Sequence, residues 1–204
     1  MAFEPVVFVV DDDARARNSV CALVRSLGLQ AEAFSSAEEF LARRTSGSAG
    51  CIVTDIRMAG MSGLDLQDRL AEQGIQLPVI VLTAYPRTRS TVRAIQAGAV
   101  TLLEKPYDEE ELWDAIRKAL AQGAAGRAEA QRRGEIRARA ARLTPAERDV
   151  MNLIVQGKPN KVIAKQLDMS TRTIESRRHE VFTKMGVESV AELVRLAIEG
   201  ELVA

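Results

Sequence analysis

Three consecutive aspartates, Asp11, Asp12 and Asp13, directly follow the apolar run Val6–Val10. At the end of a buried strand, carboxylates this close together repel one another and resist the loss of solvent. They would be tolerated on a surface turn, where they would only cap a helix, or around a bound cation. The polar residues that follow the other apolar runs distinguish between these alternatives.

Three more apolar runs end in polar residues: Asp55 lies in CIVTDIRMAG, Thr83 ends VIVLT, and Lys105 lies in LLEKPY. Functional groups of a doubly wound parallel sheet gather at the carboxyl ends of its strands, so we expect these side chains to meet. Mg²⁺ prefers a few carboxylates together with water and phosphate oxygens. A metal ion, an ammonium and a hydroxyl would each serve one oxygen of a phosphorylated aspartate. The pattern predicts such a site, with Asp13 outside it at the start of a helix.

The first 120 residues alternate between short apolar runs and amphipathic stretches of helical length. The predicted strands are Val6–Val10, Leu29–Phe34, Cys51–Thr54, Val79–Thr83 and Ala99–Leu103. The predicted helices cover about 13–27, 36–44, 63–73, 87–97 and 108–120. Five strands that alternate with five helices predict an α/β fold, in which a doubly wound five-stranded parallel sheet is covered on both faces.

The remaining residues contain no further strand pattern. Ala, Arg, Glu and Gln dominate residues 122–142, which predict a solvated helical linker, with a hinge as the alternative. Residues 143–204 predict four helices, of which two short ones are joined by a tight turn as in a helix-turn-helix. We therefore expect a first domain over residues 1–121, a linker over 122–142 and an all-α domain over 143–204.

The charge of the chain is zero overall but unevenly distributed. Residues 1–120 contain 17 Asp and Glu and 13 Lys and Arg, whereas residues 121–204 contain 11 and 15. A basic C-terminal part suggests contact with nucleic acid. The single histidine, His179, excludes a metal site built from several histidines.

The apolar runs are all much shorter than the ~20 residues that a membrane helix needs. No charged-then-apolar leader opens the chain, so we expect a cytoplasmic protein with no membrane partner. Cys21 and Cys51 lie among apolar residues, which predicts buried free thiols, with a disulfide as the alternative.

The stretch STRTIESRRHEVFTKM predicts a helix with two different faces. Ile174, Val181 and Met185 share a buried face. The opposite face carries polar side chains, namely Arg172, Glu175, Ser176, His179 and Thr183. Arg177 and Arg178 flank this face and can reach phosphates. Such a helix fits the major groove of DNA, although a merely solvated face would show the same pattern.

The first 120 residues resemble the receiver domain of two-component response regulators, including RMAGMSG, which is close to the family's RMPGMSG. The resemblance implies a flavodoxin-like and CheY-like sheet and makes Asp55 the phosphoacceptor, with Thr83 and Lys105 in supporting roles. It also implies that Mg²⁺ is held at four positions: Asp11, Asp12, Asp55 and the backbone carbonyl of Arg57. The Lys105–Pro106 peptide bond is usually cis in this family.

Residues 143–194 resemble the LuxR-type helix-turn-helix of the NarL/FixJ response regulators, and the order of the two domains is that of the FixJ branch. The resemblance implies base contacts from Glu175, Ser176 and His179. It also implies contacts to the DNA backbone from further residues: Lys161, Thr173, Arg177 and Lys184.

The combined resemblance implies a transcription regulator, not an enzyme, that a sensor histidine kinase phosphorylates. Its phosphorylated receivers would pair through residues 87–97 and 108–120, and the homodimer would bind double-stranded DNA and act with RNA polymerase. One alternative is a phosphorylation-independent regulator, because Leu102 replaces the family's usual aromatic residue and the loop after Thr83 is unusual. Another is a phosphohydrolase, but such enzymes need an acid where this chain has Arg57.

Overall fold

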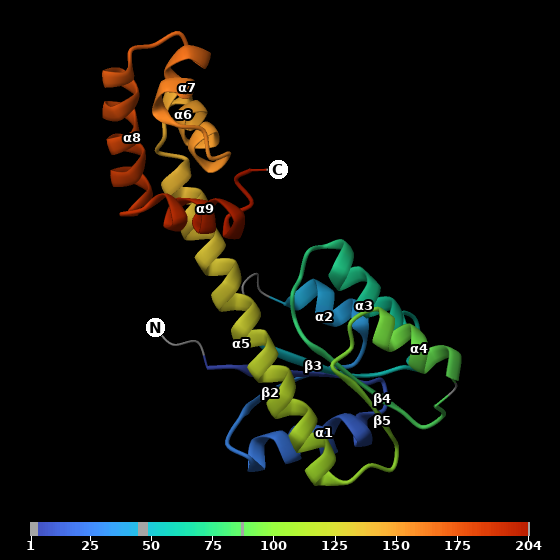
Figure 1. Ribbon diagram of the computed structural model, residues 1–204. Coiled ribbons are helices and arrows are strands. Elements are labelled where there is room, and N and C mark those ends of the chain that lie inside the picture. Colours follow the sequence, from blue (N-terminus) through green and yellow to red (C-terminus); the bar gives the residue numbers. More distant parts are fainter. Residues whose placement is uncertain (1–3, 45–48, 87, 204) are drawn as a thin grey trace. The chain divides into compact units, whose positions relative to one another are not determined.

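The computed structural model describes residues 4–44, 49–86 and 88–203 (Figure 1). The chain divides into two compact units, Met1–Arg127 and Ala128–Ala204. Arg87, at which we expected one helix to begin, lies outside the described residues. Among the described residues, no helix is long and apolar enough to cross a membrane.

The N-terminal unit is built on a five-stranded parallel sheet. Its strands are β1 (Val6–Val10), β2 (Gln30–Phe34), β3 (Gly50–Asp55), β4 (Val79–Thr83) and β5 (Thr101–Glu104), in the order β2-β1-β3-β4-β5. The register pairs Val10 with Thr54, Asp55 with Leu82, and Thr83 with Glu104. The carboxyl ends of β1, β3, β4 and β5 therefore lie nearly level, and the predicted sheet is confirmed.

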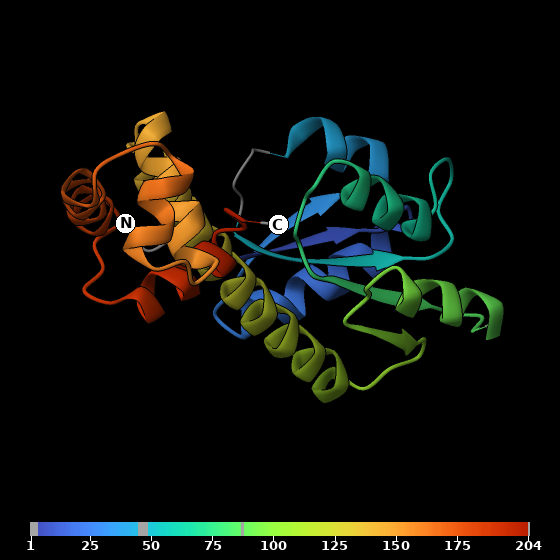
Figure 2. The same cartoon turned by 45° about the horizontal axis from the view of Figure 1, so that its top comes forward.

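Helices cover both faces of this sheet, as Figures 1 and 2 show. They are α1 (Ala14–Ser26), α2 (Ala37–Arg43), α3 (Gly63–Glu72), α4 (Thr88–Gln96) and α5 (Glu109–Ala140). Along β1, Val7 and Val9 face a core shared with α1 and α5, whereas Phe8 and Val10 face a core shared with α2, α3 and α4. Because both faces of β1 are buried, its sequence is uninterruptedly apolar.

Both cysteines lie in the core beneath α1 and α5, buried and with free thiols. Burial raises the pKa of Cys51 to about 12, and it also raises the pKa of Cys21. The prediction of buried free thiols is confirmed, and the disulfide alternative is wrong. Trp113 of α5 packs partly against the same core, and the guanidinium of Arg117 lies 5.6 Å from the centre of its ring.

Helix α5 extends well beyond the helix that we expected at 108–120. Gly123 lies close to β3, where an added Cβ would approach the Gly50 carbonyl oxygen to 3.1 Å. Ile136 and Ala140 are buried in the core of the C-terminal unit. Residues 122–140 of the expected linker are helical, and these contacts correct the expectation that all of it is solvated. A single bulky residue, Ile136, gave too weak a periodic signal to reveal this packing.

The C-terminal unit contains α6 (Pro145–Val155), α7 (Asn160–Gln166), α8 (Thr171–Met185) and α9 (Val190–Glu199). Thr144 caps α6 and forms a reciprocal capping box with Glu147. Asp168, in the turn between α7 and α8, has a φ of 52°. Ile174, Val181 and Met185 of α8 are fully buried, so the predicted inner face of this helix is confirmed.

Candidate functional site

The predicted site residues of the N-terminal unit meet at the carboxyl edge of the sheet. They line a cavity of about 300 Å³ together with residues of the adjoining loops and of α1; the described lining residues are Asp11, Asp12, Asp13, Ala16, Asp55, Arg57, Thr83, Ala84, Tyr85 and Lys105. Asp11, Asp55 and Thr83 are buried although they are polar. Side chains from the ends of four strands thus share one small polar space.

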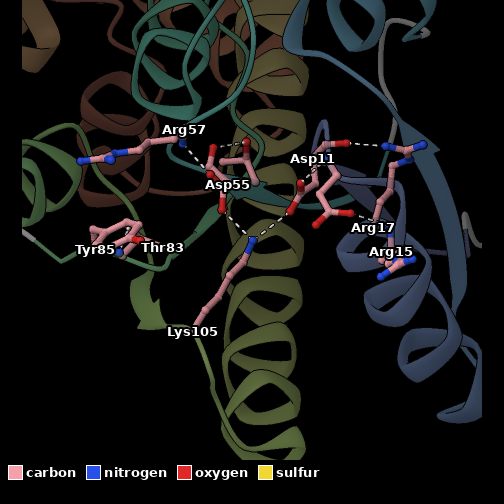
Figure 3. Close-up of polar contacts among 10 residues, drawn as sticks. Asp11, Arg15, Arg17, Asp55, Arg57, Thr83, Tyr85 and Lys105 are labelled. Atoms are coloured by element: carbon pink, nitrogen blue, oxygen red, sulfur yellow. Dashed lines mark hydrogen bonds and ion pairs between the residues drawn. The ribbon is translucent and has the colours of Figure 1, made fainter.

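Lys105 connects the two buried carboxylates (Figure 3). Its ammonium donates to Asp55 Oδ1 at 2.6 Å and to Asp11 Oδ2 at 3.0 Å. Burial by itself lowers the pKa of Lys105, but Asp55 and Asp11 outweigh that effect and raise it. The ammonium therefore stays charged and neutralises part of the negative charge of the site. The Lys105–Pro106 peptide bond is cis, as expected.

Backbone amides satisfy further oxygens of the aspartates. The Arg57 amide donates to Asp55 Oδ2 at 2.5 Å, and the Ala59 amide donates to Asp12 Oδ2 at 2.8 Å. The side chain of Asp13 caps α1 by accepting from the Arg15 amide, which confirms its expected place at the start of that helix. Lys105 and these amides explain how three successive aspartates are accommodated here.

The oxygen atoms around the cavity suit a hard divalent cation. The carboxylates of Asp11, Asp12 and Asp55 and the carbonyl group of Arg57 offer only oxygen ligands, as Mg²⁺ prefers. Over residues 4–44, 49–86 and 88–203, no three carboxylate, imidazole or thiol groups are already gathered in ligand positions. In this arrangement Asp12 is directed to the Ala59 amide, and Lys105 stands between Asp11 and Asp55.

Arg57 and Tyr85 form a pair at the cavity that the sequence did not predict. The Arg57 guanidinium lies 5.1 Å from the centre of the Tyr85 ring, and Tyr85 is 64% exposed. The Tyr85 amide donates to Thr83 Oγ1 at 3.2 Å. Arg57 lies two positions after Asp55, and Tyr85 lies two positions after Thr83. This shared spacing is the one sequence signal that could have suggested that they form a pair.

The outer face of α8 in the C-terminal unit is polar and largely free. Four of its side chains are exposed and make no hydrogen bond or ion pair with another described residue: Arg172, Glu175, Ser176 and His179. Lys161 of α7 is also exposed and free in the same sense. Arg177 is partly buried, and its Nη1 atom has no partner among the described residues.

Three other residues expected to contact DNA have partners inside the unit. Arg178 donates to Asn160 Oδ1 at 3.3 Å and lies over the Phe182 ring, so it holds α8 against the start of α7. The hydroxyl groups of Thr173 and Ser170 lie 2.8 Å apart at the start of α8.

The third of these residues, Lys184, donates to both carboxylate oxygens of Glu147 at 2.7 Å. This contact joins α8 to α6, and it occupies the ammonium of Lys184, which we predicted to contact the DNA backbone. The sequence placed Lys184 on the helix but could not reveal its partner, which lies 37 residues away in the chain.

Comparison with known proteins identifies both parts of the chain. Residues 7–117 match the response regulator receiver domain, and residues 141–197 match the bacterial regulatory proteins of the luxR family. The chain is 40% identical to the response regulator protein TmoT of Ectopseudomonas mendocina over 95% of this chain and 88% of that protein. It is 40% identical to the transcriptional regulatory protein FixJ of Bradyrhizobium diazoefficiens over 94% of each chain.

Solved structures agree with this assignment. The response regulator StyR is 38% identical, with a TM-score of 0.84 over 96% of this chain and 99% of that one. Full-length FixJ from B. japonicum is 36% identical, with a TM-score of 0.60 over the whole of both chains. The chain therefore belongs to the response regulators, and it combines a receiver domain with a LuxR-type DNA-binding domain.

Proposed function

We propose that Asp55 is the phosphoacceptor and that a sensor histidine kinase is its phosphodonor. The observation that carries this proposal is the position of Asp55: it ends β3, lines the cavity and receives the Lys105 ammonium at 2.6 Å. Transfer breaks the bond between phosphorus and a kinase imidazole nitrogen and forms a bond between phosphorus and a carboxylate oxygen of Asp55. The imidazole nitrogen keeps the electron pair of the broken bond.

The side chains of the cavity would then hold the phosphoryl group. The Lys105 ammonium neutralises negative charge on one phosphoryl oxygen, and the Thr83 hydroxyl donates a hydrogen bond to another. Mg²⁺ would be held by Asp11, Asp12, Asp55 and the Arg57 carbonyl. When bound, the ion neutralises charge that develops on the transferring phosphoryl group.

Phosphorylation would lead two receivers to pair through α4 and the start of α5. Val92 and Ile95 of α4 are 47% and 52% exposed, which makes them suitable for burial in an interface. The described residues of α4 carry positive charge at Arg89 and Arg93, whereas α5 begins with three glutamates, Glu109–Glu111. Opposite charges on the two helices favour pairing between copies.

Paired receivers would bring two DNA-binding domains to a palindromic site on double-stranded DNA in the cytoplasm, where the dimer would act with RNA polymerase. The free face of α8 would enter the major groove. Arg172, Glu175, Ser176 and His179 are our candidates for base contacts, and Lys161 and Arg177 for phosphate contacts. Thr173 and Arg178 would instead position the helix, and Lys184 would stabilise the domain.

The test is molecular mass by light scattering in Mg²⁺, with and without beryllofluoride as a mimic of the phosphoryl group. We expect a monomer that becomes a dimer, and we expect Asp55→Asn to remain monomeric. A response of Asp55→Asn to a phosphodonor would overturn the assignment of the phosphoacceptor. A turnover assay with a phosphate monoester checks the non-enzymatic proposal, for which no multiple turnover is expected.

A further inference from the structure

Apolar packing holds α4 only weakly to the rest of the receiver. Of the described residues in α4, only Ala94 is buried. Val92 and Ile95 are about half exposed, as given above. A helix with so little buried apolar surface must owe its position to other contacts.

One such contact comes from α3, which lies beside α4 in Figures 1 and 2. Gln67 of α3 is only 4% exposed, and its Nε2 atom donates to the carbonyl oxygens of Ala94 at 3.2 Å and Ala97 at 2.8 Å. Both carbonyls lie at the C-terminal end of α4, where the last helical carbonyls have no amide of a following helical turn to accept from. The Ala94 carbonyl also accepts from the Ala99 amide at 3.0 Å. One buried side chain therefore fixes the end of α4.

An ion-pair contact between α3 and α4 accompanies this one. Arg93 of α4 donates through Nη2 to Asp65 Oδ1 at 2.8 Å and to Asp68 Oδ2 at 2.6 Å, and both aspartates belong to α3. These side chains are about half exposed, so the ion pairs stabilise the contact between α3 and α4 less than the hydrogen bonds of the buried Gln67 amide do.

The contact is incomplete in one respect. Gln67 Oε1 is buried and has no hydrogen-bond partner among the described residues. A buried acceptor without a hydrogen bond has lost its contact with water and gained nothing in return. This desolvation cost opposes the present arrangement of α3 and α4. A small change at α3 can then release α4, which would let Gln67 reach water.

Helix α3 also begins in direct contact with the phosphoacceptor strand. The Gly63 amide donates to the Ile56 carbonyl oxygen at 3.2 Å, and an added Cβ on Gly63 would lie 2.2 Å from the Asp55 carbonyl oxygen. Because the backbones touch here, movement of Asp55 acts directly on the first turn of α3. Gln67 lies four residues further along, one helical turn away.

We propose that the contact of Gln67, Asp65 and Asp68 with α4 holds α4 in its unphosphorylated position, and that its release is required for receivers to pair. This regulation rests on the proposed function, since it acts on the same phosphorylation and the same pairing face. The signal from Asp55 would travel through α3, in addition to any signal through Thr83 and the loop after it.

The test uses Gln67→Leu and Asp68→Asn, singly and together. Both changes lie on α3 and replace no side chain of the α4 pairing face, but Asp68→Asn removes one of the two ion-pair partners of Arg93. Gln67→Leu removes the two donated hydrogen bonds and the unpaired oxygen at nearly constant volume. Arg69→Ala is the matched control, because Arg69 belongs to α3 and its one ion-pair partner among the described residues is Glu72 of the same helix.

We expect the double variant without beryllofluoride to dimerise with a dissociation constant at least fivefold lower than that of the wild type. Amide hydrogen exchange in 93–97 should become faster in the same variant, and Arg69→Ala should match the wild type in both measurements. Unchanged dimerisation and unchanged exchange in the double variant would overturn the proposal, as would faster exchange without stronger dimerisation. If Gln67→Leu fails to fold, the same two measurements are made on Asp68→Asn alone, which changes an exposed side chain, and the same outcomes support or overturn the proposal.

Failure of the proposed function would look different. In that case the wild type would not dimerise with beryllofluoride, although binding of the mimic could be shown separately. Amide hydrogen exchange in the wild type then tests the release of α4 by itself. Faster exchange in 93–97 when beryllofluoride binds supports the release, and unchanged exchange overturns it.

Discussion

The ammonium of Lys105 joins the end of β5 to the end of β3 across the intervening strand β4, through its contact of 2.6 Å with Asp55 Oδ1. The same ammonium reaches Asp11 after β1, so one cation spans most of the carboxyl edge of the sheet. Besides its proposed role as a partner for the phosphoryl group, Lys105 would compete with any other cation for these carboxylates.

We predict that Lys105→Met binds Mg²⁺ about tenfold more tightly than the wild type. Without the ammonium, Asp11 and Asp55 keep uncompensated negative charge that a divalent cation can neutralise. Isothermal titration calorimetry measures the affinity, and Lys118→Met, a change at an exposed lysine of α5, is the control. Unchanged or weaker binding would show that the ammonium does not compete with the metal ion.

We predict that Tyr85→Ala shortens the lifetime of the phosphorylated protein by about two- to fivefold, the range that a cation–π contact of about 0.5–1 kcal/mol allows. Removing the ring frees the Arg57 side chain and gives water better access to the cavity. Loss of phosphate is followed by gel separation of the two forms over time. Tyr85→Phe keeps the aromatic ring and should keep the wild-type lifetime, and equal lifetimes for all three proteins would contradict the role of the pair.

We predict that alanine substitution of two arginines of α8 affects two different properties, DNA binding in one case and stability in the other. Arg172→Ala should leave stability within about 0.5 kcal/mol of the wild type. It should weaken binding to the cognate site by about 5- to 150-fold, the equivalent of about 1–3 kcal/mol for a base contact. Arg178→Ala should lower the free energy of unfolding by about 1 kcal/mol through loss of its bond to Asn160. Urea unfolding and fluorescence anisotropy on labelled DNA separate the two effects, and a stability loss in Arg172→Ala would count against its free position.

We predict that the Glu147–Lys184 contact makes the C-terminal unit sensitive to acid. The hydrogen bond from Lys184, followed by that from the Thr144 amide, lowers the pKa of Glu147 below its ordinary value. The pKa of Glu147 is lower in the folded than in the unfolded protein. Its ionised carboxylate therefore contributes fully to the free energy of unfolding above the unfolded pKa of about 4.3, and this contribution is lost as pH falls through the folded pKa. Glu147→Gln should cost about 1.5–3 kcal/mol of unfolding free energy at pH 7 and much less near pH 2. Glu188→Gln, at an exposed position, serves as the reference, and an equal loss at both pH values would exclude this ion pair as the cause.

The sheet and the site could be predicted because their signals are local or follow from topology. β1 and β4 have the bounds that their apolar runs indicated, and the other strands differ by one or two residues at their ends. Once the strands are parallel and in doubly wound order, their ends must converge, so Asp11, Asp55 and Lys105 had to meet.

The remaining features depend on pairings that no local pattern encodes. Lys184 and Arg178 look like phosphate contacts in a helical projection, but their partners lie in other helices. Ile136 is one apolar residue in a polar stretch, and only the tertiary packing reveals that it is buried. The Arg57–Tyr85 contact depends on the side-chain conformations of two different loops.

The position of Trp113 has a practical consequence. It is the single tryptophan of the sequence, and it lies on the part of α5 that covers the receiver sheet. Intrinsic fluorescence excited at the red edge of protein absorption therefore reports on the receiver alone, whereas far-ultraviolet circular dichroism is dominated by helices of both units. Recording both signals during one denaturant titration gives each unit its own unfolding curve without a dye or a truncated protein.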